Sequence, residues 1–177
     1  MAESLYNQIV DAVVTRLASP VGDFGATWWH TPDKVIRHPA FVEACLDPSV
    51  GNPATIIVVS PGEEEIVGAT FGPSGKYQAR AVLDITVAQY YDRGDDPFAT
   101  FTSERPSRGT VQDRLIRDAL KALHKDQADG LGTVFGLSDV SIATGAPDRT
   151  AENTYHERFA IAFIPAQVTY FYPVSTP

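Results

Sequence analysis

Residues 76–91 read KYQARAVLDITVAQYY and carry the strongest periodic pattern in the sequence. Apolar side chains occupy almost every second position, and the polar side chains Gln78, Arg80, Asp84 and Thr86 lie between them. Successive side chains of a β-strand point to opposite faces, so this alternation predicts one long strand with a buried face and a wetter face. The side chains expected on the buried face are Tyr77, Ala79, Ala81, Leu83, Ile85, Val87 and Tyr91, with Gln89 as the exception.

A second β pattern comes just before this strand. Residues 54–59 are mostly β-branched, and Ser60, Pro61 and Gly62 after them form a turn signal. Residues 63–69 are therefore expected to return as the hairpin partner of 54–59. Three consecutive acids, Glu63, Glu64 and Glu65, open this second segment.

The C-terminal third of the chain is also rich in β pattern. It predicts a modest strand at 134–143 and a long strand at 154–164, in which Tyr155, Phe159, Ile161 and Phe163 share one face. Pro165 is expected to end the long strand, because proline cannot donate a backbone hydrogen bond, and 167–172 would continue at an edge.

Two segments have the spacing of amphipathic helices. Residues 4–18 place apolar side chains every three to four positions, with Ser4 as the expected N-cap and Ser19-Pro20 as the stop. The second helix is expected to begin at Thr110, where Thr110 to Asp113 fits a capping box, and to end at Gly130.

Strands this close in sequence favour hairpin pairing. We therefore predict an α+β fold with a mainly antiparallel sheet and two helices packed on one face. Residues 1–177 are expected to form one domain, with a long irregular connection at 20–53 and a long loop at 92–109. The core is expected to join the strand at 76–91 to Ile9, Val13, Leu115, Leu120 and Phe159.

Composition narrows the functional classes. The formal net charge is −8, and the basic residues are scattered along the sequence, which disfavours tight binding to nucleic acid. A single cysteine, Cys45, excludes an intramolecular disulfide. No apolar run is long enough to span a membrane, and the N-terminus lacks a signal-peptide pattern, so we expect a protein folded in the cytoplasm.

The sequence contains none of the common catalytic or cofactor motifs. No phosphate-binding loop, nucleophile elbow or paired Cys motif occurs, and the four histidines lie at no metal-ligand spacing. The strongest acid–base candidates are His156, Glu157 and Arg158 with Asp84, a set that is equally typical of cross-strand charge pairs. We therefore predict no enzyme activity, no metal and no cofactor.

Several residues are instead candidates for protein contacts. The long strands carry charged and aromatic side chains that can fix one subunit against another, or can simply solvate the outer sheet face: Arg80, Asp84, Tyr90, Tyr155, Glu157 and Arg158. The irregular connection and the long loop carry candidates for partner contacts, which are Trp28, Trp29, Arg93, Arg105 and Arg108. Trp28 and Trp29 can equally fold over the edge of the core.

The order of elements resembles the tail terminators of long-tailed bacteriophages, the lambda-type minor tail protein family. The opening helix LYNQIVDAVV at 5–14 and the strand YHERFAIAF at 155–163 resemble the family's first helix and last long strand. The similarity covers roughly residues 1–18 and 54–172 and is one of pattern and order. The segment 20–53 departs from the family pattern and leaves open a related neck or connector protein.

The resemblance implies a structural virion component assembled in the host cytoplasm. The family forms a hexameric ring that caps the tail tube, meets the major tail tube protein and the head-completion proteins, and lets DNA pass without reading it. Glu63, Glu64 and Glu65 would then be candidates for the lumen. The alternative is a small-molecule or peptide-binding α+β domain with weak hydrolytic activity, which would stay monomeric where a ring subunit assembles.

Overall fold

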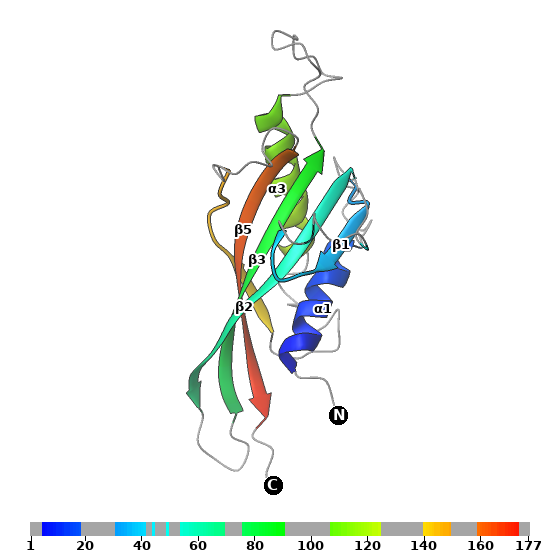
Figure 1. Cartoon of the computed structure of the whole chain (residues 1–177). Coiled ribbons are helices and arrows are strands. Elements are labelled where there is room, and N and C mark those ends of the chain that lie inside the picture. The colour runs from blue at the N-terminus through cyan, green and yellow to red at the C-terminus, as the bar shows by residue number, and fades with distance from the viewer. Residues whose placement is uncertain are drawn as a thin grey trace.

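The computed structural model describes residues 5–18, 31–41, 44, 49, 54–69, 76–90, 107–124, 140–149 and 159–173 (Figure 1). In chain order, the elements are α1 (Leu5–Ala18), β1 (Lys34–Arg37), β2 (Thr55–Ala69), β3 (Lys76–Tyr90), α3 (Arg108–His124), β4 (Ser141–Thr144) and β5 (Phe159–Pro173).

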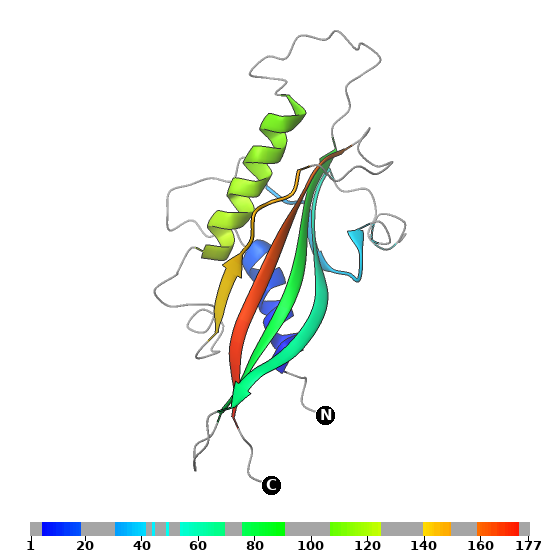
Figure 2. The ribbon, with the colours of Figure 1, turned by 90° about the vertical axis from the view of Figure 1, so that its left-hand side faces the viewer.

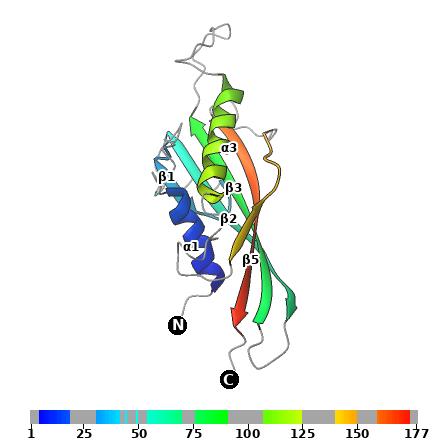
Figure 3. The ribbon, with the colours of Figure 1, turned by 180° about the vertical axis from the view of Figure 1, so that it is seen from behind.

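The strands form one sheet in the order β1-β2-β3-β5-β4. Strands β1 and β2 run parallel, and the other neighbouring strands pair antiparallel. Helix α1 packs on the β1–β2 half of the sheet and α3 on the half that contains β5 and β4. Both helices lie on the same face, as Figure 3 shows from that side and Figure 2 shows nearly edge-on. The predicted α+β fold, with a mainly antiparallel sheet and two helices on one face, is confirmed.

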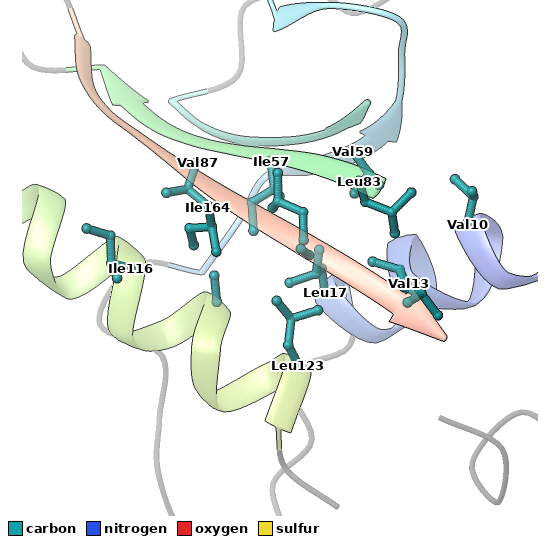
Figure 4. Packing of buried hydrophobic residues seen from close by; sticks show 14 of the residues in the cluster. Val10, Val13, Leu17, Ile57, Val59, Leu83, Val87, Ile116, Leu123 and Ile164 are labelled. Atoms are coloured by element: carbon teal, nitrogen blue, oxygen red, sulfur yellow. The ribbon is translucent and has the colours of Figure 1, made fainter. Parts of the chain in front are cut away.

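The main core lies between this face and the helices. Figure 4 shows Val13 and Leu17 of α1, Leu123 of α3 and Leu83 of β3 pointing toward one another. The predicted alternation of β3 is confirmed over its central part, where the buried residues on the helix face are Ala79, Ala81, Leu83, Ile85 and Val87. Burying a leucine in this position contributes about 1.5–3 kcal/mol relative to leaving it exposed.

Two expected core residues lie elsewhere. Tyr77 is 41% exposed, because it lies at the end of β3 that extends past the helices. Phe159 pairs with Tyr90, which places it on the opposite face of the sheet from Leu83. Tyr91 lies outside the described residues.

The opposite face has a smaller core of its own. It consists of Phe41, Ala44, Ile56, Val58, Ala88 and Ile161, with Ile36, Phe159 and Phe163 packed against it. The Phe41 and Phe159 rings meet edge to face, with centroids 6.3 Å apart. This end of the sheet is therefore buried on both faces, which explains the uninterrupted apolar run at residues 56–59.

Strand β2 is one continuous strand, so the predicted hairpin between 54–59 and 63–69 is wrong. The whole strand pairs with β3, and its register shifts by one residue between Pro61 and Glu64 and again between Ile66 and Gly68. Pro61 and Gly62 therefore mark a β-bulge rather than a turn. A Cβ atom on Gly62 would lie 2.9 Å from the backbone oxygen of Val82, so the close approach of the two strands requires glycine.

The prediction that Pro165 ends a strand is wrong, because Pro165 lies inside β5 (Phe159–Pro173). Its carbonyl accepts a hydrogen bond from the N–H of Gly145, at 2.8 Å. In extended backbone the nitrogen and the carbonyl of one residue face the same neighbour, so the nitrogen of Pro165 also faces the β4 side. There it lies between the end of β4 at Thr144 and the bridge from Asp148 to Phe163, where no ladder donor is required.

Helix α3 begins two residues before the predicted start. The hydroxyl of Ser107 accepts a hydrogen bond from the N–H of Thr110 at 3.2 Å, so Ser107 is the N-cap and Thr110 lies in the first turn. The predicted end at Gly130 lies outside the described residues, as does the part of the predicted strand at 134–143 that precedes Val140. Strand β1 lies within the segment 20–53, which had been expected to be irregular.

Candidate functional site

Three strands continue past both helices at one end of the sheet (Figures 1 and 3). We refer to residues 62–69 of β2, 76–82 of β3 and 167–173 of β5 as the arm. Its base still belongs to the main core, where Ala79, Ala81, Val168 and Tyr170 are buried, and its tip passes the helices. The β3–β5 ladder is unbroken over the whole arm. The β2–β3 ladder is less regular, because both register shifts of β2 lie in the arm or at its start.

Large apolar side chains are exposed on the arm. Ile66 is 65% exposed and Val67 42% on β2, while Tyr77 and Val82 on β3 are each 41% exposed. In the described part of the chain, the only other large apolar side chain with comparable exposure is Tyr90, at the opposite end of β3. Ile66 and Tyr77 share the face that carries the helices, whereas Val82 lies on the opposite face. Apolar residues gathered in one place on a surface mark interaction sites, whereas scattered ones are ordinary.

The outer edge of the arm is a strand edge with acidic side chains. Strand β1 pairs with residues 56–59 of β2, and no other described strand pairs with β2 beyond that point. Glu63, Glu64 and Glu65 lie on this free edge and are exposed. Glu64 accepts a hydrogen bond from the hydroxyl of Tyr170, whereas Glu63 and Glu65 contact no hydrogen-bond or ion-pair partner among the described residues. Their place in a lumen stays a prediction.

A polar cluster joins the base of the arm to α1. The hydroxyl of Tyr6 donates a hydrogen bond to the carbonyl of Gly62 at 2.9 Å, inside the β-bulge. Arg37 at the end of β1 donates to the side-chain oxygen of Asn7 at 2.6 Å and lies 3.7 Å from a carboxylate oxygen of Asp11. These contacts fix the position of α1 relative to the bulge where the arm begins.

Burial raises the pKa of the Tyr6 hydroxyl above its ordinary value of 10.0. The nearby carboxylate of Glu64 also raises this pKa, since a negative neighbour disfavours the phenolate, while the guanidinium of Arg37 acts in the opposite direction. The hydroxyl therefore stays protonated at neutral pH and remains a hydrogen-bond donor to the bulge.

The outer sheet face carries three of the predicted subunit-contact residues. Arg80 is half-buried in the arm, with Glu65 and Thr169 as its cross-strand neighbours, and its Nε atom has no hydrogen-bond partner in the described part of the chain. Asp84 is exposed farther along the same face. Tyr90 lies at the far end of β3 and packs edge to face on Phe159, with ring centroids 5.7 Å apart.

Of the other predicted contact residues, the structure describes Arg108 alone. Arg108 lies in the first turn of α3. The remaining candidates lie outside the described residues, and they are Trp28, Trp29, Arg93, Arg105, Tyr155, Glu157 and Arg158. Of the suggested acid–base set of Asp84, His156, Glu157 and Arg158, the structure describes Asp84 alone.

Helix α3 carries a basic surface that the sequence analysis missed. Arg114, Arg117 and Lys121 follow one another at spacings of three and four residues, which places them on one side of a helix. Arg117 and Lys121 are exposed, and neither has an ion-pair partner among the described residues. The basic residues are scattered in sequence, and the helical spacing was the signal that could have revealed this face.

The described histidines make local contacts. A ring nitrogen of His124 lies 2.9 Å from the hydroxyl oxygen of Thr144, and one of His38 lies 3.0 Å from the carbonyl of Ala40. Within the described ranges, no group of three or more His, Cys, Asp or Glu side chains could hold a metal ion. No described helix is both long and apolar enough to cross a membrane.

The sequence matches no protein-family model, and no curated protein is significantly similar to it.

Proposed function

We propose that this protein is a structural subunit that assembles with copies of itself into a ring, of the tail-terminator type found at the head–tail junction of long-tailed phages. The arm is the observation that carries the proposal. It presents exposed Ile66, Val67 and Tyr77 on three paired strands whose tip passes both helices. An exposed apolar surface of this kind suits a protein contact.

The position of the arm favours contact with another copy. A ring of identical subunits needs a heterologous interface, in which one surface of each subunit meets a different surface of its neighbour. The arm lies at one end of the sheet, away from α3, and so leaves the rest of the molecule free to receive the arm of another subunit. The order of helix, long strands, helix and final long strand also supports a ring subunit of this family.

In this role the ring ends polymerisation of the tail tube and offers its other side to the head-completion proteins. DNA passes through the lumen without being bound. The net charge of −8 supports this part of the proposal, because a strongly basic lumen would retain the phosphate backbone.

Tube assembly tests the proposal. Purified protein is added to the major tail tube protein of the same particle while that protein polymerises, and tube length and tube ends are recorded by electron microscopy. We expect ring-shaped particles in the protein alone and shorter tubes capped at one end in the mixture. Unchanged tube lengths, together with a protein that stays monomeric at every concentration, would favour the small-molecule or peptide-binding alternative.

A further inference from the structure

We infer that the acidic edge of the arm binds the basic face of α3 in the neighbouring copy. The acidic edge is residues 63–67 of β2, and the basic face is Arg114, Arg117 and Lys121. This inference rests on the proposed self-assembly and names the surfaces that would make the contact.

The acidic edge has both an unsatisfied charge and an apolar part. Glu63 and Glu65 have no ion-pair partner among the described residues, and Ile66 and Val67 follow them directly on the same free strand edge. An edge with charged side chains resists pairing with other strands, so its expected partner is a surface with side chains of opposite charge rather than another strand.

The basic face of α3 is a surface with side chains of opposite charge. Arg117 and Lys121 are exposed on α3 and lack ion-pair partners in the described part of the chain. Both have long aliphatic stems, which can cover apolar side chains such as Ile66 and Val67 while the charged ends reach the glutamates. The charges of the two surfaces are therefore complementary, and so are their apolar parts.

The two surfaces lie on different parts of the sheet. The acidic edge belongs to β2, while α3 packs on the half of the sheet that contains β5 and β4. One molecule therefore presents the acidic edge on one side and the basic face on the other. That arrangement gives a head-to-tail contact, which repeats from copy to copy and closes into a ring when the rotation permits.

A nucleic acid is a weaker candidate for the basic face. The chain as a whole is acidic, at −8, and Asp113 lies beside Arg114 and Arg117 on α3. Phosphate backbones would be repelled by most of the surrounding surface. The acidic edge of a second copy also brings the apolar side chains of Ile66 and Val67, which the aliphatic stems of Arg117 and Lys121 can cover.

A charge-swap experiment tests the inference. One variant carries Glu63→Lys and Glu65→Lys, and a second carries Arg117→Glu and Lys121→Glu. Sedimentation velocity would measure assembly against concentration. We expect each variant alone to assemble at least about tenfold more weakly than the wild type, because like charges would then face each other. The assembly of the wild type should also weaken as salt is added.

Mixing the two variants should restore assembly. In the mixture a basic edge meets an acidic α3, and an acidic edge meets a basic α3, so the two variants can alternate around a ring with an even number of copies. Gln8→Lys with Thr15→Lys is the control, since it adds two lysines at exposed positions of α1. This control should assemble like the wild type. All variants should keep the thermal midpoint of the wild-type monomer.

The outcomes separate the inference from the proposed function. Wild type that assembles while both charge-reversal variants assemble equally well would overturn the inference and leave the ring proposal standing. If each variant assembles weakly alone and mixing does not restore assembly, the inference is also overturned and the ring proposal stands. Wild type that stays monomeric would overturn both.

Discussion

The hydroxyl of Tyr170 on β5 donates a hydrogen bond to the carboxylate of Glu64 on β2, although β3 lies between these two strands. The register pairs Tyr170 with Ala79 and Glu64 with Ala81, so all four side chains share the helix face. Two small alanines on β3 let the buried tyrosine reach across to the acidic edge. The contact links the outermost strand of the arm to the core.

Replacing Tyr170 with phenylalanine should therefore loosen this edge. The variant keeps the ring in the core and loses the hydrogen bond, and we expect the free energy of unfolding to fall by about 1 kcal/mol. Urea denaturation measures the change. Glu64→Gln keeps an acceptor oxygen and should cost less. Equal stability of Tyr170→Phe and the wild type would show that the hydrogen bond contributes nothing.

The β-bulge in β2 makes a prediction about two glycines of the same strand. Gly62→Ala places a Cβ 2.9 Å from the carbonyl oxygen of Val82 and should destabilise the protein by about 1–3 kcal/mol. Gly68→Ala is the matched control, because a Cβ there meets nothing within 4 Å. It should be neutral, or stabilising by up to about 1 kcal/mol. Thermal unfolding of both variants tests the bulge, and similar midpoints would count against it.

Adjacent positions on β3 test the assignment of its faces. Leu83 is fully buried, so Leu83→Ala should lower the free energy of unfolding by about 2–5 kcal/mol. Val82 is 41% exposed on the other face, and Val82→Ala should cost less than about 1 kcal/mol. Chemical denaturation of the two variants measures both losses in unfolding free energy. If the faces were reversed, Val82→Ala would cost more than Leu83→Ala.

The raised pKa of Tyr6 makes the stability depend on pH in the alkaline range. In the unfolded chain this hydroxyl titrates near its ordinary value of 10.0, and in the folded chain it titrates above that. The contribution of Tyr6 is therefore fully present below about pH 10 and is lost as the pH rises through the folded-state pKa. The difference in unfolding free energy between wild type and Tyr6→Phe should be constant near neutral pH and shrink above pH 10. A constant difference throughout would be inconsistent with a pKa that partial burial raises.

The faces of β3 could be predicted because alternation is a local property of the sequence. Pro61-Gly62 and Pro165 were misinterpreted because their local signals favour turns and strand ends. Pairing with β3, which depends on residues far away in sequence, instead keeps both strands continuous through these sites. The four residues of β1 carry too little pattern to be recognised before their parallel partner β2 is known.

The candidate site was predictable in part. Glu63, Glu64 and Glu65 stood out in the sequence as three consecutive acids, and the structure places them on a strand edge. The exposure of Ile66 and Val67 depends on where the helices end relative to the sheet, which no local pattern specifies. The role of Arg117 and Lys121 could not be predicted from the sequence. It depends on the topology, which places α3 on the half of the sheet opposite the β2 edge.

Self-assembly through the arm is the central claim, and the mass of the protein in solution tests it most directly. Multi-angle light scattering would compare the wild type with Ile66→Ser/Val67→Ser over a wide range of concentrations. Both side chains are exposed, so the change should leave the monomer folded. We predict that the wild type reaches the mass of a closed ring, and that the variant stays monomeric at concentrations where the wild type has assembled. A monomeric wild type throughout, or a variant that assembles equally well, would contradict the account.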